Sequence, residues 1–270
     1  MNPRLQPNPV SPATLALHYD LLGSGEPVLV LPGFGCANWI FKDAATKLGG
    51  RYRFVLPDHR GMGASQHAPG PYTIADMAAD ALRLMDELGY QRFHVIGISM
   101  GGFVAQSLCL QARNRVQRLI LMCTTSSGPD FLPLTPFTET QLREAFAMTP
   151  TDMISQSMAA TVHPAFRARD PQRFDRLYQL RLSHRADCEQ AVLQLKAANA
   201  FLDTPMPISE IHCPALALTG TEDRFVPPEN AAILADTLPQ GQFQLIPESD
   251  HWFFWEREDE TCEKITAFLG

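Results

Sequence analysis

The sequence predicts an α/β fold, a mostly parallel sheet flanked by helices, with a helical insertion between core strands. Short apolar runs alternate with helical patterns, which favours parallel strands joined by helices. The pentapeptide Gly97-Ile98-Ser99-Met100-Gly101 lies between one such run and a helical segment. The alternation then stops over residues 125–207, a stretch too long for a plain loop.

The core strands are expected where apolar runs are bounded by turn-forming residues. The helix over 73–88 has the clearest ends, with Thr73 as N-cap, Asp76 at the capping-box position and Gly89 as its stop. The expected strands are 15–22, 28–31, 52–56, 93–98, 118–122, 215–218 and 243–246, and the expected core helices are 73–88, 100–111 and 258–269.

The insertion contains helical patterns, and prolines punctuate both of its ends. We therefore expect two parts, a core of residues 1–124 and 208–270 and an insertion of residues 125–207. The helices expected in the insertion are 139–148, 151–160, 171–182 and 187–200.

Composition narrows the function classes. The chain has 270 residues, 45% of them hydrophobic and 19% charged, enough for one large core plus an insertion. A net charge of −7 gives no global basic surface for nucleic acid. The six cysteines are scattered without metal-ligand spacing, so we expect no metal and a reduced, cytoplasmic setting. No segment has the pattern of a signal peptide or a membrane span, so no membrane association is expected.

The pentapeptide has the pattern of a nucleophile elbow, in which a strained turn projects the serine hydroxyl above a sheet. Asp223 follows the predicted strand over 215–218, and His251 follows the strand over 243–246. A serine hydroxyl becomes a good nucleophile when a base such as His251 removes its proton. A buried carboxylate would fix the tautomer of that histidine and stabilise its charged form. The predicted catalytic residues are therefore Ser99, Asp223 and His251.

Each assignment has an alternative. Ser99 could be a simple turn residue, and Glu222 or Asp250 could replace Asp223 as the acid. Asp250 is too close in sequence to orient His251 naturally. Four other histidines fit surface loops, strand faces or helix faces better than a catalytic position: His59, His94, His163 and His184.

An acyl-transfer site also needs two backbone N–H donors for the developing oxyanion. Met100 follows the nucleophile directly and is the first expected donor. Phe34 lies in the loop Pro32-Gly33-Phe34-Gly35 after the strand over 28–31, and it is the second.

On these motifs the chain resembles the α/β-hydrolase superfamily, in particular capped carboxylesterase-like serine hydrolases. The resemblance covers nearly the whole chain, including the loop over 57–65 and the segment that begins His251-Trp252. It implies an α/β-hydrolase fold in which residues 125–207 form a helical cap over Ser99. Family members usually have His-Gly where this chain has Pro32-Gly33, so a loop-bracing histidine is missing while the backbone donor of Phe34 remains.

The expected reaction is hydrolysis of a small or medium carboxylic ester through an acyl-enzyme, without a cofactor. Lactonases and carbon–carbon hydrolases on this fold use the same triad and remain alternatives. Carbon–carbon hydrolases often have asparagine before the serine, where this chain has Ile98, and tryptophan after the histidine, which Trp252 matches. Trp252 is therefore a candidate substrate contact, and Arg181 or Arg185 could bind a substrate carboxylate. A non-catalytic receptor is the remote alternative.

The cap carries two further sets of residues that could affect substrate binding. Arg169, Arg173 and Arg176 recur at helical spacing, which indicates either a solvated face or a basic surface for an anionic substrate or an acyl carrier. The residues expected to line the pocket or fill the cap core are Phe131, Phe137, Phe146, Met148, Met153, Met158 and Phe201.

Overall fold

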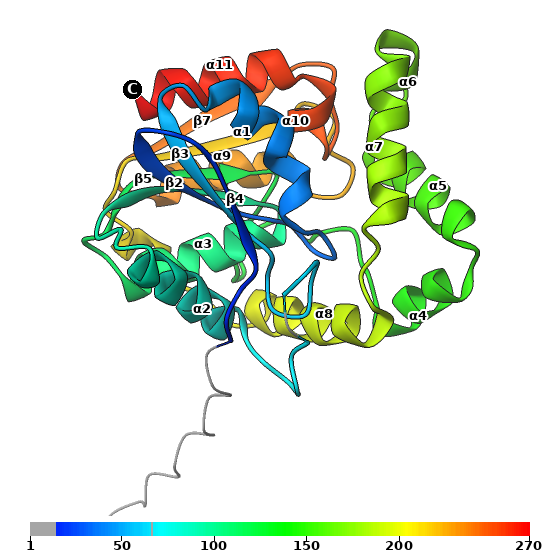
Figure 1. Cartoon of the computed structure of the whole chain (residues 1–270), viewed down its shortest axis with the longest axis horizontal. Coiled ribbons are helices and arrows are strands. Elements are labelled where there is room, and N and C mark those ends of the chain that lie inside the picture. Colours follow the sequence, from blue (N-terminus) through cyan, green and yellow to red (C-terminus); the bar gives the residue numbers. More distant parts are fainter. Residues whose placement is uncertain (1–14, 66) are drawn as a thin grey trace, which may run out of the picture.

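A seven-stranded sheet forms the centre of the computed structural model, which describes residues 15–65 and 67–270 (Figure 1). Its strand order is β1-β3-β2-β4-β5-β6-β7. The edge strand β1 runs antiparallel to β3, and all other neighbouring pairs are parallel. The mostly parallel sheet is therefore confirmed. Its strands are β1 (Tyr19–Gly23), β2 (Glu26–Leu31), β3 (Tyr52–Pro57), β4 (Phe93–Ile98), β5 (Val116–Met122), β6 (Ala215–Gly220) and β7 (Gly241–Ile246).

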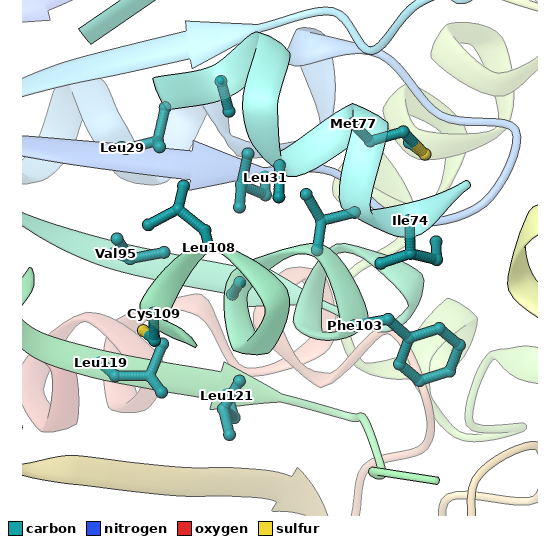
Figure 2. Close-up of a cluster of buried hydrophobic side chains, with 14 of the residues drawn as sticks. Leu29, Leu31, Ile74, Met77, Val95, Phe103, Leu108, Cys109, Leu119 and Leu121 are labelled. Carbon is teal, nitrogen blue, oxygen red and sulfur yellow. The ribbon is translucent and has the colours of Figure 1, made fainter. Parts of the chain in front are cut away.

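Helices cover both faces of the sheet (Figure 1). The alternation of side chains along β4 shows why, because Val95 packs into one buried cluster while Ile96 and Ile98 pack into another. Figure 2 shows part of the first cluster, in which Leu108 lies near the strand residue Val95. The first face carries α2 (Ile74–Glu87), α3 (Met100–Gln111) and α9 (Glu229–Thr237), and the second carries α1 (Lys42–Leu48) and α11 (Glu258–Leu269).

The helix α2 begins and ends where its sequence predicts. Thr73 and Asp76 form a reciprocal capping box, in which each side chain accepts a hydrogen bond from the other's backbone N–H. Gly89 follows the helix with φ of 78°, a conformation that glycine adopts without strain.

Three core helices were not predicted: α1, α9 and α10 (Phe253–Glu256). They have seven, nine and four residues, too few for a clear helical period. The first strand also differs, since β1 begins at Tyr19 rather than at residue 15. Pairing with β3 sets its extent, and one strand's sequence does not show that pairing.

The insertion is helical, as expected, and each predicted helix is found within two residues of its ends. A short additional helix, α6, ends at Arg169. The next residue, Asp170, accepts a hydrogen bond from Arg173 N through its side chain and caps α7. The division at residues 125 and 207 stays a prediction, and we use "cap" for 125–207. Its helices are α4 (Glu139–Ala147), α5 (Pro150–Thr161), α6 (Phe166–Arg169), α7 (Pro171–Ser183) and α8 (Cys188–Leu202).

Candidate active site

Ser99 lies in a sharp turn between β4 and α3. Its φ of 53° and ψ of −120° are unusual for a residue with a side chain, so the surrounding structure must hold it there. Ser99 N donates to Met122 O at 2.8 Å, and Ser99 O accepts from Gly102 N at 2.8 Å and from Thr124 Oγ1 at 2.7 Å. Hydrogen bonds on both sides of the residue therefore maintain the strained elbow.

The two glycines of the pentapeptide allow the turn to pack closely. A Cβ atom on Gly101 would lie 2.1 Å from Leu31 O, and one on Gly97 would lie 2.6 Å from Gly101 O. Any side chain at these positions would force the helix α3 away from the sheet. Glycine is thus required on both sides of Ser99 for reasons of space.

The structure brings the three predicted catalytic residues together. His251 Nε2 lies 3.0 Å from Ser99 Oγ, and His251 Nδ1 lies 2.8 Å from Asp223 Oδ2. The other oxygen of Asp223 accepts from the backbone N–H groups of Phe225 and Val226, at 2.9 and 2.8 Å. Because both carboxylate oxygens accept, Nδ1 carries the imidazole proton and Nε2 is free to accept from the serine hydroxyl.

Two opposing influences set the pKa of His251. Burial alone lowers the pKa of His251. The charge of Asp223 and its hydrogen bond, with smaller contributions from the charges of Asp250 and Glu256, raise this pKa by a larger amount. The net effect is a raised pKa. Electrostatics at the site therefore favour the imidazolium that forms when the serine proton is taken up.

The competing carboxylates bind other groups. Glu222 is exposed and pairs with His163 at 3.1 Å. Asp250 is fully buried, and it accepts from Arg224 Nε at 2.6 Å and from the backbone N–H of His251 at 2.8 Å. Neither carboxylate reaches the imidazole ring through a hydrogen bond in the part of the chain that the structure describes.

A buried acid behind the histidine was not found from the sequence. Glu256 accepts hydrogen bonds from Asp250 N at 2.9 Å and from His163 N at 3.1 Å, and so joins the loop that carries His251 to the cap. Burial raises its pKa to about 7, although both hydrogen bonds oppose this shift. Arg224 makes a second connection, since its Nη2 donates to Val162 O at 2.9 Å. These contacts join distant segments, and no local spacing indicates them.

Both residues predicted to donate to the oxyanion border the active-site cavity. Phe34 and Met100 line the cavity that contains Ser99. Gly33 lies so close to the nucleophile that a Cβ atom on it would be 3.3 Å from Ser99 Cβ. The backbone of the Phe34 loop therefore passes directly beside the serine.

A cavity of about 1000 Å³ opens above Ser99, between the core and the cap. Trp252 lies in its wall, stacked on Trp39 with ring centroids 6.1 Å apart. Of the residues expected to line the pocket or fill the cap core, two do not line the cavity. Met158 is buried in a hydrophobic cluster, and Phe201 stacks on Phe103 with ring centroids 4.6 Å apart. The expected residues that do line the cavity are Phe131, Phe137, Phe146, Met148 and Met153.

The three arginines at helical spacing do not form a free basic surface. Arg173 Nε donates to Trp255 O at 2.7 Å, and its Nη2 pairs with Glu258 at 2.5 Å. Arg169 donates to the backbone carbonyls of Glu248 and Glu256, and Arg176 pairs with Asp43 on α1. None of the three lines the cavity. These contacts favour a role for the three arginines in joining the cap to the core, and guidance of an anionic substrate or an acyl carrier by them stays a prediction.

The described residues contain neither a metal-binding cluster nor a membrane-spanning helix. No cluster of histidine, cysteine, aspartate and glutamate side chains there could hold a metal ion. No helix in that part of the chain is both long and apolar enough to cross a membrane.

Comparisons with known proteins agree with the fold described above. The family model described as alpha/beta hydrolase fold matches residues 26–258. A 2-hydroxy-6-oxononadienedioate/2-hydroxy-6-oxononatrienedioate hydrolase from Paraburkholderia phymatum is 30% identical, covering 95% of this chain and 91% of that protein. A thermophilic esterase from Thermogutta terrifontis superimposes with a TM-score of 0.81 at 28% identity, covering 94% and 92% of the two chains. The enol-lactonase from Burkholderia xenovorans LB400 superimposes with a TM-score of 0.80 at 21% identity, covering 94% of this chain and 96% of that chain. At this identity the comparison shows a likeness of fold alone.

Proposed function

We propose that this chain, which belongs to the α/β-hydrolase family, cleaves small or medium carboxylic esters through an acyl-enzyme on Ser99. The observation that carries the proposal is the continuous hydrogen-bonded line from Asp223 through His251 to the Ser99 hydroxyl, with distances of 2.8 and 3.0 Å. The largely aromatic and aliphatic wall of the cavity supports a substrate that is partly apolar.

In the first step, Ser99 Oγ attacks the ester carbonyl while His251 Nε2 takes up its proton. Asp223 keeps the imidazole in the required tautomer and stabilises its positive charge. The backbone N–H groups of Phe34 and Met100 donate to the oxyanion of the tetrahedral intermediate. His251 then protonates the leaving alcohol and afterwards activates the water that releases the acid.

Replacing Ser99 by alanine tests the mechanism. We expect the turnover of a p-nitrophenyl ester by purified protein to fall by several orders of magnitude, with the fold unchanged. Turnover within about tenfold of the wild type would contradict the nucleophile and everything built on it. A pure binding protein would show no turnover in either form.

A second candidate activity is hydrolysis of a carbon–carbon bond or a lactone in an anionic substrate. The guanidinium of Arg181 lies over the Trp252 ring, 4.8 Å from its centroid, and its Nη2 donates to Ser157 Oγ at 2.6 Å. Its buried Nη1 has no partner among the described residues, which suits a carboxylate in the cavity. The relative from Paraburkholderia phymatum is named for the hydrolysis of a dioate. Ile98 argues against hydrolysis of a carbon–carbon bond, since carbon–carbon hydrolases often have asparagine at this position.

A substrate panel separates the two activities. It should contain esters of increasing acyl length, lactones and vinylogous diketones, each assayed with the wild type and with Arg181→Met. Ester hydrolysis predicts the highest kcat/KM on a neutral ester and little effect of the substitution there. A preference for anionic substrates that Arg181→Met abolishes would favour the second activity.

A further inference from the structure

The loop that carries Phe34 is held by side chains from two distant segments. Gln194, on the cap helix α8, accepts a hydrogen bond from Gly35 N at 2.7 Å. His59, in the loop after β3, has its Nε2 3.1 Å from Pro32 O. Gln194 is 0% exposed and His59 is 1% exposed, so both contacts are shielded from water. His59 is thus a buried residue, although the sequence favoured a surface loop.

The protonation of His59 follows from its surroundings. Burial lowers its pKa to about 4, so the ring is neutral near pH 7. Because a carbonyl oxygen only accepts hydrogen bonds, Nε2 must carry the proton and donate to Pro32 O. This contact supplies a histidine brace to a loop whose own sequence, with Pro32-Gly33, contains none.

Three consecutive peptide units in this loop are each fixed by one hydrogen bond. The unit before Gly33 is held through Pro32 O by His59, and the unit after Phe34 is held through Gly35 N by Gln194. The unit between them is held by Cys36 N, which donates to Gly33 O at 3.2 Å. Since a peptide unit is planar and trans, fixing Gly33 O also fixes the direction of the Phe34 N–H.

The cap also holds the Phe34 side chain. Phe34 packs against the hydrophobic cluster of α4 and α8, and its ring lies edge-on to Phe137 with centroids 6.2 Å apart. The same stretch of α8 therefore contacts this loop twice, through its apolar residues and through Gln194. Gly35 has φ of 64°, a conformation that glycine adopts without strain, so the chain can turn directly after the N–H that Gln194 binds.

We propose that Gln194 and His59 are positioning residues that hold the Phe34 N–H toward the oxyanion, so that the seating of the cap helix α8 controls this donor. The proposal rests on the acyl-enzyme mechanism above. Neither side chain is a catalytic residue, because each acts on the backbone of the loop. The proposal predicts that losing the Gln194 or the His59 hydrogen bond weakens binding of the tetrahedral intermediate more than binding of the ester.

The test compares Gln194→Met with Gln190→Met. Gln190 lies one turn earlier on α8, is 7% exposed and accepts from Ala68 N at 2.8 Å, so it has a similar buried amide with no contact to the Phe34 loop. For Gln194→Met we expect kcat to fall about 10- to 100-fold with KM within about threefold, less than the loss of a direct oxyanion donor. The affinity for a trifluoromethyl ketone, whose adduct with Ser99 carries an oxyanion, should fall in parallel with kcat/KM.

For Gln190→Met we expect kcat within about threefold of the wild type, since the Phe34 loop keeps its brace. If Gln194→Met does not fold, Gln194→Asn replaces it, because its shorter amide cannot reach Gly35 N. For His59, the leucine variant should show the same loss, and His59→Gln, which keeps a donor, should restore activity.

An unchanged kcat and an unchanged ketone affinity in Gln194→Met, alongside an active wild type, would overturn the positioning role. So would equal losses in the Gln190 and Gln194 variants. Failure of the acyl-enzyme mechanism looks different, since Ser99→Ala would then retain its turnover.

Discussion

His251 presents its two ring nitrogens to different partners, and this arrangement defines the role of Asp223. With Nδ1 bound to a carboxylate, Nε2 faces Ser99 without a proton. In Asp223→Asn the amide can bind Nδ1 as a donor, which favours the opposite tautomer. We expect kcat to fall by about 10⁴-fold. Steady-state kinetics on a p-nitrophenyl ester measures this.

Glu222 and Asp250 provide the matched controls for that substitution, because both are carboxylates close to the triad that bind other groups. The changes Glu222→Gln and Asp250→Asn should lower kcat far less. If Asp250→Asn caused the larger loss, the assignment of the triad acid would be wrong.

The raised pKa of His251 has a consequence for the pH profile. His251 must be neutral to act as a base, so kcat/KM should fall as the pH drops through the pKa of the free enzyme. Since that pKa is raised, the acid limb should lie above the ordinary histidine value of about 6.5. Asp250→Asn removes one of the charges that raise it and should shift the limb to lower pH. A limb below the ordinary value in the wild type would contradict this account.

Residues near the active site differ in how well the sequence predicts them. Ser99, Asp223 and His251 each follow a recognisable strand in a fixed order, so a local pattern identifies them. Gln194 looks like any polar residue on an amphipathic helix, and its contact with Gly35 spans 159 positions. Only the packing of α8 against the core decides that its amide is buried.

At the scale of elements, the cap is anchored by the arginines of α6 and α7. Arg173 combines a hydrogen bond to Trp255 O, an ion pair with Glu258 and stacking over the Trp255 ring at 4.8 Å. Arg173→Met should therefore lower the free energy of unfolding by about 1.5–3 kcal/mol. Urea denaturation of the purified protein measures this loss.

Arg176→Met is the matched control on the same helix. Its side chain is 59% exposed and, among the described residues, pairs with Asp43 alone, so its loss should cost less than about 1 kcal/mol. Neither variant should show a salt-dependent loss on anionic esters. Such a loss in the two variants would restore the basic surface that the structure argues against.

The same scale shows what local patterns can predict about elements. The helix α2 carries a capping box and a terminal glycine, and its predicted ends agree with the structure. The short helices α1, α9 and α10 carry no comparable signals. They form because the chain must cover the sheet and return to its edge, which tertiary packing decides.

At the scale of the whole molecule, the core contains a buried ion pair between Arg60 and Asp80. Arg60 Nε donates to Asp80 Oδ2 at 2.7 Å, both side chains are 1% exposed, and the guanidinium lies 5.2 Å from the Tyr72 ring centroid. Asp80→Asn would leave the arginine charge buried without its partner, and we expect a loss of about 3–5 kcal/mol in unfolding free energy.

The control for that substitution is Asp86→Asn, also on α2. Asp86 is 56% exposed where it pairs with Arg115, so its loss should cost less than about 1 kcal/mol. Equal losses of unfolding free energy in Asp80→Asn and Asp86→Asn would contradict the view that burial of the Arg60–Asp80 pair determines the size of the loss.

The central claim is that Ser99 forms the covalent intermediate, and active-site labelling tests it most directly. The purified protein is treated with a serine-directed phosphonate, and its mass and the modified peptide are determined. We predict one adduct per chain, located on Ser99, with loss of ester turnover in proportion to labelling and no adduct in Ser99→Ala. An adduct on another residue, or full ester turnover by protein labelled at Ser99, would contradict the claim.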